Sequence, residues 1–353
     1  MNMFYELIQI ALGYRKVLNN TLSDVEWHDL YVMCQKQSMT GVVFGTLEGL
    51  SSQGQKPSLE LLCQWMGIAG LIKHQNIVLN KEVEALTSLL DRHQIKYAVV
   101  KGQVVARYYE KPEYRHSGDI DFYIPEKDAR VAKIVIEDEW QVEMERGSSL
   151  KHYAFNHNGV MFEMHFHLFE WYNESKNNMW NEILYGVMNH RVKIGDTQVA
   201  TLDPTIHSLY IFLHLYHHLL ELGVGLRQFC DWAMILHACK DEIDHEAIKK
   251  HLKVFGMEKA YKACGAILVR DLGLPANEFT YELTDYDMRY ADKILDVVFY
   301  RGNMGHYNKR GGFHGWKHKL ESTGIKLSHF FKFYPLAPSF MRDWVWGVVK
   351  SRL

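Results

Sequence analysis

The spacing of apolar residues changes twice along the chain. Up to residue 93, apolar residues recur every three or four positions, which is typical of amphipathic helices. Between residues 94 and 200 they form short alternating runs, which are typical of strands. From residue 201 the helical spacing returns. The pattern predicts an α+β protein with an N-terminal helical region at 1–93, a core with a small mixed sheet at 94–200 and a C-terminal helical domain at 201–353.

Capping residues indicate where several helices begin. Ser23 and Glu26 have the spacing of a capping box, and Asp203-Pro204 suits the start of another helix. A long helical stretch is expected within residues 57–90. Further helices are expected at 205–222, 226–240, from Asp244, at 257–272 and at 284–300, followed by a Gly-rich loop at 301–315.

The core is expected to contain mostly short strands. Asn158-Gly159 separates two alternating runs, and both residues tolerate the positive φ of a type I′ turn, so the pair predicts a hairpin. The expected elements are strands at 95–100, 119–124, 141–145, 152–157 and 160–168, a helix at 126–140 and a second short hairpin at 192–199.

Composition and charge exclude several classes of protein. Of 353 residues, 47% are hydrophobic and 23% are charged, as in ordinary globular proteins rather than disordered chains. The 40 basic and 42 acidic residues give a formal net charge of −2, so no overall field attracts long nucleic acid or an anionic membrane. The five cysteines form no CxxC motif, which argues against a disulfide framework or a structural zinc site.

The cellular location is predicted from what the sequence lacks. The N-terminal segment has no basic start before an apolar block, so it does not have the pattern of a signal peptide. The chain has no apolar run of about 18 residues, the length needed to span a membrane. We therefore expect a cytoplasmic protein without a transmembrane segment.

The candidate chemistry centres on acidic residues at strand spacing. Asp119 and Asp121 point to the same side of a strand, and Glu163 lies on the polar face of a later strand together with His165 and His167. Hard divalent cations prefer such oxygen ligands. If the two strands are neighbours, three carboxylates can hold two Mg²⁺ ions around a triphosphate. On a polar face Asp121 is expected to be exposed and to contribute little to folding.

Two alternatives remain open for these residues. The DxD spacing also occurs on ordinary solvated strand faces. Glu163, His165 and His167 can alternatively form a zinc site, which would indicate a zinc-dependent hydrolase.

Several motifs occur in a characteristic order along the chain: Val100-Lys101-Gly102, Tyr109, Pro112, Arg115, Gly118-Asp119-Ile120-Asp121, Glu163-Met164-His165, His214, His218, Arg227 and Asp231. Their combined spacing resembles the bacterial uncharacterised nucleotidyltransferase family, within the DNA polymerase β-like superfamily. That family has a block reading LKG…Y…R..GDIDLLV, then an E-x-H strand, then a helical part with His, His, Arg and Asp. The resemblance covers about residues 15–265.

The resemblance implies a nucleotidyltransferase fold and assigns roles to particular residues. It implies that Asp119, Asp121 and Glu163 are the catalytic metal ligands and that Glu163 also assists deprotonation of the acceptor hydroxyl. The turn reads Gly102-Gln103 where many superfamily members have Gly-Gly or Gly-Ser. The nucleotide-binding residues that it implies are Lys101, Gly102, Arg115, His165, His214, His218 and Arg227, and Gln103 is added because its amide N–H can donate to a phosphate.

The histidine pair at 214 and 218 has two further interpretations. The two residues are one helical turn apart, so they share a face, which can hold a zinc ion or serve helix packing alone. Arg227 and Asp231 have the same spacing and can form an ion pair within one helix.

The sequence as a whole predicts a Mg²⁺-dependent nucleotidyltransferase. It would move a nucleoside monophosphate from a nucleoside triphosphate to an unknown acceptor hydroxyl, on a small molecule or a protein, and release pyrophosphate. The alternative is a non-catalytic nucleotide-binding or regulatory module with the same fold. Near-neutral charge argues against a long nucleic acid as partner.

Overall fold

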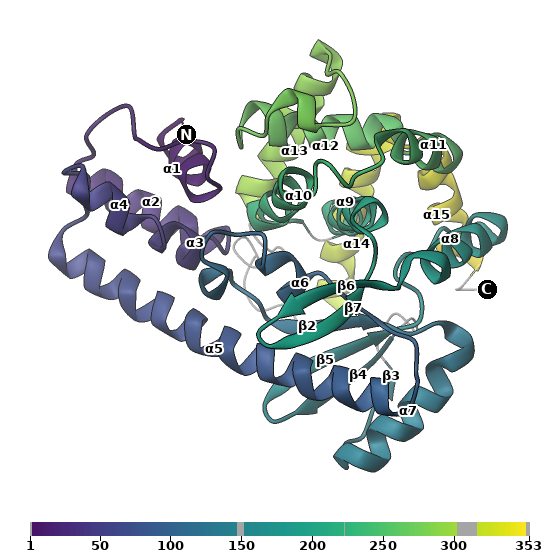
Figure 1. The fold of residues 1–353 in the computed structure, drawn as a ribbon. Coiled ribbons are helices and arrows are strands. Elements are labelled where there is room, and N and C mark those ends of the chain that lie inside the picture. The colour runs from purple at the N-terminus through teal and green to yellow at the C-terminus, as the bar shows by residue number, and fades with distance from the viewer. Residues whose placement is uncertain (1, 147–151, 222, 302–315, 351–353) are drawn as a thin grey trace. The chain divides into compact units, whose positions relative to one another are not determined.

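The computed structural model describes residues 2–146, 152–221, 223–301 and 316–350 (Figure 1). The chain divides into two compact units. One, the helical unit, comprises Met1–Ala69 and Ile211–Leu353, and the other, the sheet unit, comprises Gly70–Tyr210. The boundaries fall inside two helices, α5 (Leu59–Arg92) and α9 (Pro204–Glu221). The division into three regions stays a prediction.

The helical unit is formed by the predicted helices that precede and follow the sheet unit in the sequence. The capping box of Ser23 and Glu26 is present at the start of α2, where each side chain bonds the other residue's backbone N–H. Besides parts of α5 and α9, the helices are α1 (Asn2–Ala11), α2 (Asp24–Lys36), α3 (Thr40–Phe44), α4 (Leu47–Ser52), α10 (Leu226–Ala238), α11 (His245–Phe255), α12 (Glu258–Arg270), α13 (Asp285–Arg301), α14 (Trp316–Phe333) and α15 (Pro338–Lys350), with short 3₁₀ turns η2 (Ala276–Glu278) and η4 (Tyr334–Leu336).

The predicted Gly-rich loop at 301–315 lies outside the described residues, except for Arg301, which is the last residue of α13. Among the helices that the structure describes, none combines the length and the apolar character needed to cross a membrane.

The sheet unit is built on a five-stranded mixed sheet, so the predicted α+β fold is confirmed. The strand order is β1-β2-β5-β4-β3, in which β2 and β5 are parallel and the other neighbours antiparallel. A separate hairpin pairs β6 with β7. The elements are β1 (Ala98–Val100), α6 (Gly102–Ala106), η1 (Pro112–Tyr114), β2 (Asp119–Tyr123), α7 (Glu126–Trp140), β3 (Glu145–Arg146), β4 (His152–His157), β5 (Val160–His165), α8 (Glu174–Val187), β6 (His190–Ile194) and β7 (Thr197–Thr201).

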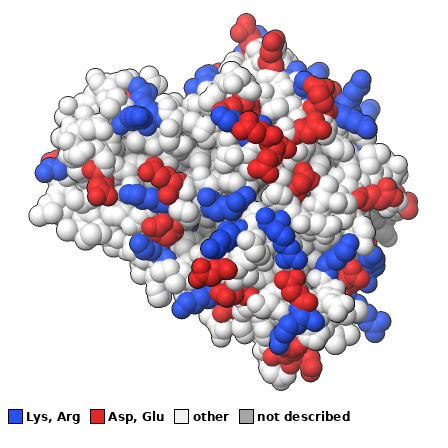
Figure 2. Space-filling model, in the orientation of Figure 1, with Lys and Arg blue, Asp and Glu red and all other residues white. Residues whose placement is uncertain are grey.

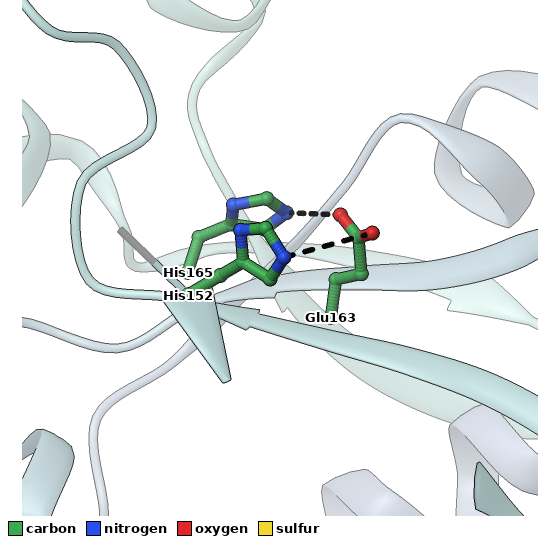
Figure 3. A group of neighbouring side chains, drawn as sticks. All are labelled: His152, Glu163 and His165. Carbon is green, nitrogen blue, oxygen red and sulfur yellow. Dashed lines mark ion pairs between the residues drawn. The ribbon is translucent and has the colours of Figure 1, made fainter. Parts of the chain in front are cut away.

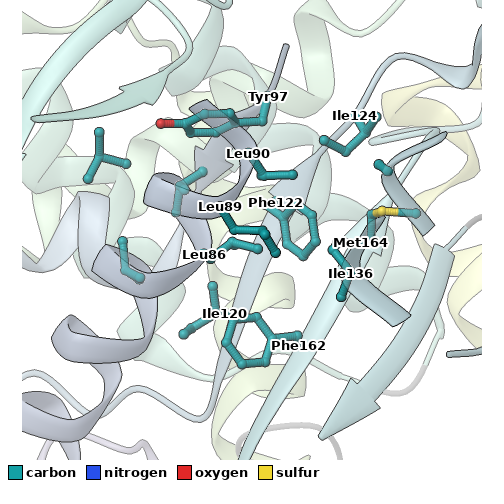
Figure 4. Packing of buried hydrophobic residues seen from close by; sticks show 14 of the residues in the cluster. Leu86, Leu89, Leu90, Tyr97, Ile120, Phe122, Ile124, Ile136, Phe162 and Met164 are labelled. Atoms are coloured by element: carbon teal, nitrogen blue, oxygen red, sulfur yellow. The ribbon is translucent and has the colours of Figure 1, made fainter. Parts of the chain in front are cut away.

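One face of the five-stranded sheet packs into the core of this unit. Ile120 and Phe122 on β2, and Phe162 and Met164 on β5, are at most 2% exposed. They pack against leucines of α5 and against Ile136 of α7 (Figure 4). Because side chains alternate along a strand, burial of these residues turns the intervening polar residues to the opposite face.

The hairpin predicted from Asn158-Gly159 is present between β4 and β5. Asn158 has φ 51° and Gly159 has φ 79°, as a type I′ turn requires. The turn fixes the register in which His157 faces Val160 and His152 faces His165. The turn chemistry therefore positions two histidines opposite each other at the far end of the hairpin.

Gly159→Ala is expected to lower the free energy of unfolding by about 1–2 kcal/mol, because a Cβ is disfavoured at positive φ. The space around Gly159 is open, so the loss reports backbone conformation rather than a clash. Urea denaturation measures it, with Gly186→Ala in α8 as the control, because that glycine is helical and also open. A loss in Gly186→Ala equal to that in Gly159→Ala would contradict the prediction.

Two segments differ from the sequence-based expectation. The strand expected at 141–145 is reduced to the two residues of β3, because Gln141 ends α7 in a left-handed conformation (φ 52°). Helix α8 was not predicted. It buries only Trp180 and Leu184, so its apolar signal is weak, and its start depends on the Asn173 side chain, which accepts from the Lys176 N–H.

Candidate active site

The polar face of the sheet brings three carboxylates together. Asp119 and Asp121 lie on β2, and Asp121 is directly opposite Glu163 of the parallel strand β5. One carboxylate oxygen from each of the three residues lies within 4.8 Å of the others. The two strands are therefore neighbours, with all three acidic side chains on the face that is turned away from the core.

Lys101 follows β1 directly and contacts this cluster. Its Nζ lies 2.8 Å from Asp121 Oδ1, and both side chains are largely buried. This corrects the expectation that Asp121 is exposed, since only 4% of the residue is accessible. The reason is that β1 pairs with β2 with Val100 opposite Asp121, so the turn after β1 directs Lys101 to the carboxylate.

The backbone of this turn is unusual. Lys101 has φ 56° and ψ −138°, a conformation that costs a non-glycine residue about 1–3 kcal/mol. The Lys101 N–H donates a hydrogen bond to His207 Nε2 at 3.2 Å, which holds the turn. Gly102 follows with φ 32°, and a Cβ there would lie 3.5 Å from the Asp119 carbonyl oxygen. The turn therefore passes close to the strand that carries the aspartates.

His165 connects two of the three carboxylates. Its Nε2 lies 2.8 Å from Asp121 Oδ1 and 3.3 Å from Glu163 Oε2. Although burial alone favours neutral imidazole, the hydrogen bonds to Asp121 and Glu163 raise the pKa of His165. The hydrogen bond from His165 in turn lowers the pKa of Glu163.

The buried charges at Asp121 and Lys101 stabilise each other. Burial alone favours the neutral acid, but the Lys101 ammonium and the His165 ring together hold the pKa of Asp121 well below its usual range. Burial likewise favours neutral lysine, yet Asp121 keeps the pKa of Lys101 above its ordinary value. Both groups are therefore charged at neutral pH.

His207 provides a neutral acceptor beside this charged pair. Burial, together with the nearby basic side chains of Arg107, His190 and Lys101, lowers the pKa of His207 to about 3. A neutral imidazole keeps a lone pair on Nε2, which is the atom that accepts from the Lys101 N–H.

The three carboxylates fit a divalent cation such as Mg²⁺. Mg²⁺ takes oxygen ligands in an octahedron with metal–oxygen distances of about 2.0–2.1 Å, which places cis ligands about 3 Å apart. Carboxylate oxygens that already lie within 4.8 Å of one another need only small rotations to reach such positions. Asp119 and Glu163, which are half-buried, keep the cluster accessible.

Comparison with known proteins places this site in a family. Residues 23–272 match the profile of a family described as "Uncharacterised nucleotidyltransferase". The chain belongs to this family. The match includes the Lys101 turn and the three carboxylates, and it agrees with the family named from the sequence. A comparison with curated proteins found no match.

A solved structure is also similar to this chain. It is the "antigenic nucleotidyltransferase-like protein from Paracoccidioides brasiliensis", with 13% sequence identity and a TM-score of 0.38. The similarity covers 60% of this chain and 96% of that chain.

Two more of the predicted nucleotide-binding residues, Gln103 and Arg115, lie in the sheet unit and are buried. The Gln103 amide donates to Asn80 Oδ1 on α5. The Arg115 guanidinium donates to Ser117 Oγ at 2.8 Å. Their role in nucleotide binding stays a prediction, and these contacts show that both residues also hold the segment around the site.

The remaining residues of the family motif belong to the helical unit. His214 and His218 lie on α9 with their Nε2 atoms 3.1 Å apart, so the predicted i,i+4 pair is formed. Arg227 and Asp231 lie one turn apart on α10, and Asp231 is buried. The contact of His214, His218 and Arg227 with a nucleotide stays a prediction.

The zinc alternative joined Glu163 to His165 and His167, but the structure places a different pair of histidines beside Glu163. Strand β5 ends at His165, and His167 Nε2 instead lies 3.6 Å from Glu126 Oε2. His152 of β4 instead joins Glu163 and His165, with donor atoms of all three within 4.8 Å. Sequence reasoning missed His152, although its position was implied by the hairpin register counted from Asn158-Gly159.

Proposed function

We propose that this chain transfers a nucleoside monophosphate from a nucleoside triphosphate to an acceptor hydroxyl and releases pyrophosphate. Membership of the nucleotidyltransferase family supports the coarser activity, transfer of a nucleotidyl group. The observation that carries the finer proposal is the convergence of Asp119, Asp121 and Glu163 on neighbouring strands, within the part of the chain that matches the family.

The proposed reaction assigns a task to each carboxylate. Asp119, Asp121 and Glu163 would hold two Mg²⁺ ions, which supply positive charge to the triphosphate. The acceptor oxygen bonds to the α-phosphorus, the bond from that phosphorus to the bridging oxygen breaks, and pyrophosphate leaves with the bonding electrons. Glu163 accepts the hydroxyl proton, and His165 orients Glu163 through its hydrogen bond.

Lys101 contributes charge of its own. Its ammonium neutralises Asp121 when no nucleotide is bound. We assign it to the triphosphate oxygens in the loaded site, because a lysine is a flexible point charge that suits phosphate. Transfer of the ammonium from Asp121 to phosphate would leave the carboxylate available as a ligand.

The acceptor is proposed to be a small molecule or a protein. On the face drawn in Figure 2, acidic and basic side chains are interspersed, and neither sign covers the face. The formal net charge of −2 agrees with this pattern. Long nucleic acids are bound through many cationic contacts to phosphate, so this distribution favours the other two acceptor classes.

Asp119→Asn is expected to reduce nucleotidyl transfer at least about 100-fold, as removal of a charged group at the reacting centre generally does. The protein is incubated with Mg²⁺, each labelled nucleoside triphosphate in turn, and pools of metabolites or proteins. Pyrophosphate release and mass spectrometry of the products measure transfer. The Mg²⁺-dependent increase in melting temperature with nucleotide should also disappear in the variant.

The matched control is Asp196→Asn in the turn between β6 and β7, because its carboxylate is fully exposed and lies 3.9 Å from Lys193 Nζ. This variant should keep the transfer rate and the Mg²⁺-dependent melting shift of the wild type. Equal rates for Asp119→Asn and the wild type would rule out the carboxylate assignment.

The second candidate function is a non-catalytic nucleotide-binding module. The observation that favours it is Gln103, whose amide donates to Asn80 within the fold at the position where many superfamily members carry glycine or serine. Such a module would bind nucleotide with Mg²⁺ and lose that binding in Asp119→Asn, but would release no pyrophosphate. Pyrophosphate release by the wild type therefore separates the two functions.

A further inference from the structure

Two histidines flank Glu163 from one side of the candidate active site. His152 on β4 is directly opposite His165 on β5, and Glu163 precedes His165 by two residues, so all three share a face of the sheet. Figure 3 shows both imidazole rings turned toward the Glu163 carboxylate, each facing a different oxygen. The His152 Nε2 lies 3.9 Å from Oε1, and the His165 Nε2 lies 3.3 Å from Oε2.

The separations between these donor atoms match those around a small transition-metal ion. Zn²⁺ binds nitrogen and oxygen at about 2.0–2.2 Å in a tetrahedron, which places ligand atoms about 3.3–3.5 Å apart. The two histidine–glutamate distances of 3.3 and 3.9 Å lie close to that edge length. Asp121 lies outside this set, because its Oδ1 contacts the Lys101 ammonium at 2.8 Å and forms a hydrogen bond with His165 Nε2 at 2.8 Å.

We propose that His152, Glu163 and His165 bind one divalent transition-metal ion. Imidazole nitrogen suits Zn²⁺, Co²⁺ and related ions, whereas Mg²⁺ prefers oxygen ligands alone. The donors come from the neighbouring strands β4 and β5, whose register is fixed by the sheet, so they are largely preorganised.

The proposed position differs from the Mg²⁺ position in its donors. The mixed nitrogen–oxygen set contains both histidines and does not contain Asp119, whereas the oxygen set contains Asp119 and neither histidine. Glu163 belongs to both sets, and Asp121 belongs to the oxygen set. The proposal does not require nucleotidyl transfer, because binding of the ion is measured without nucleotide.

The test is a Co²⁺ titration of the untagged full chain after removal of metals with a chelator. Co²⁺ with nitrogen ligands in a four- or five-coordinate site absorbs visible light far more strongly than octahedral, all-oxygen Co²⁺. The wild type should bind one equivalent with this strong absorption, and a large excess of Mg²⁺ should not displace it. His152→Ala should weaken binding at least about 10-fold.

Two matched variants locate the ion. His167→Ala removes a neighbouring histidine that faces Glu126, and Asp119→Asn removes a carboxylate that belongs only to the oxygen set. Both should bind Co²⁺ as the wild type does. If Asp119→Asn weakens binding as much as His152→Ala, or if Mg²⁺ displaces the ion, the ion lies in the oxygen set and the proposal is wrong.

A second measurement covers the case in which His152→Ala does not fold. X-ray absorption spectroscopy of the Zn²⁺-loaded wild type counts imidazole ligands directly. Two imidazoles per ion support the assignment, and one or none overturns it. A wild type that binds Co²⁺ as expected but releases no pyrophosphate would contradict the proposed function and leave the proposed metal site intact. Failure of the metal site and failure of the proposed function are therefore distinguishable.

Discussion

Asp121→Asn is expected to lower the free energy of unfolding by about 3–5 kcal/mol, the usual effect of removing one partner of a buried ion pair. In the variant, the Lys101 ammonium stays buried without the carboxylate that lies 2.8 Å away in the wild type. His165 loses its 2.8 Å contact to the same oxygen. Urea denaturation at neutral pH measures the loss.

A double variant separates the ion pair from other effects of the substitution. Lys101→Met with Asp121→Asn removes both charges, and a buried pair replaced by uncharged groups generally costs little. We expect the double variant to recover most of the stability that Asp121→Asn loses. Asp119→Asn, at a half-buried position on the same strand, should cost no more than about 1 kcal/mol. A double variant no more stable than Asp121→Asn would contradict the expectation.

Local patterns in the sequence predicted much of the site. The alternation of Ile120 and Phe122 with Asp119 and Asp121 determines which face the carboxylates occupy, and burial of the apolar residues confirms it. The Asn158-Gly159 turn defines the hairpin that ends in the Glu163 strand. Such signals lie within a few residues of one another, so they can be predicted without knowledge of tertiary contacts.

Contacts between distant segments were not predictable in this way. The Lys101 N–H bonds His207, which is 106 residues further along the chain. The pairing of Lys101 with Asp121 depends on β1 lying antiparallel beside β2 in one particular register. Neither partner carries a sequence signal of this contact. Asp121 was expected to be exposed and to contribute little to stability. Its burial, which makes it important for stability, therefore became visible only in the structure.

The pKa of His207 predicts a loss of stability in acid. Burial and nearby positive charge lower that pKa to about 3 in the folded protein. In the unfolded chain the pKa of a histidine is about 6.5. Between these values the unfolded state binds a proton that the folded state does not. Stability therefore falls as the pH falls, by about 1.4 kcal/mol for each pH unit.

Other groups of the site act in different pH ranges. The pKa of Asp121 is lowered, so its contribution is complete above about pH 4 and is lost only in stronger acid. The pKa of His165 is raised, so its contribution is complete below about pH 6.5 and is lost as the pH rises beyond that. Between pH 6 and pH 4 the protein also begins to lose the contribution of glutamates with a lowered pKa, such as Glu163, so a comparison with a His207 variant is needed to isolate His207.

His207→Gln is expected to remove most of this acid sensitivity. Glutamine keeps a hydrogen-bond acceptor near the position of Nε2 but takes up no proton, so the Lys101 turn keeps its contact. Urea denaturation at pH 6 and pH 4 should show the wild type losing about 2–3 kcal/mol more than the variant. Burial also lowers the pKa of His152 and His245, but both residues remain in the variant, so their effects cancel in the difference.

The control for this comparison is His74→Gln, because His74 is exposed on α5 and the substitution is the same. Its stability at the two pH values should follow that of the wild type. If His207→Gln loses as much stability in acid as His74→Gln does, His207 is not the group that takes up the proton. The Lys101 turn would then be held by an imidazole whose protonation does not change on unfolding, and the charged pair with Asp121 would carry the local stability alone.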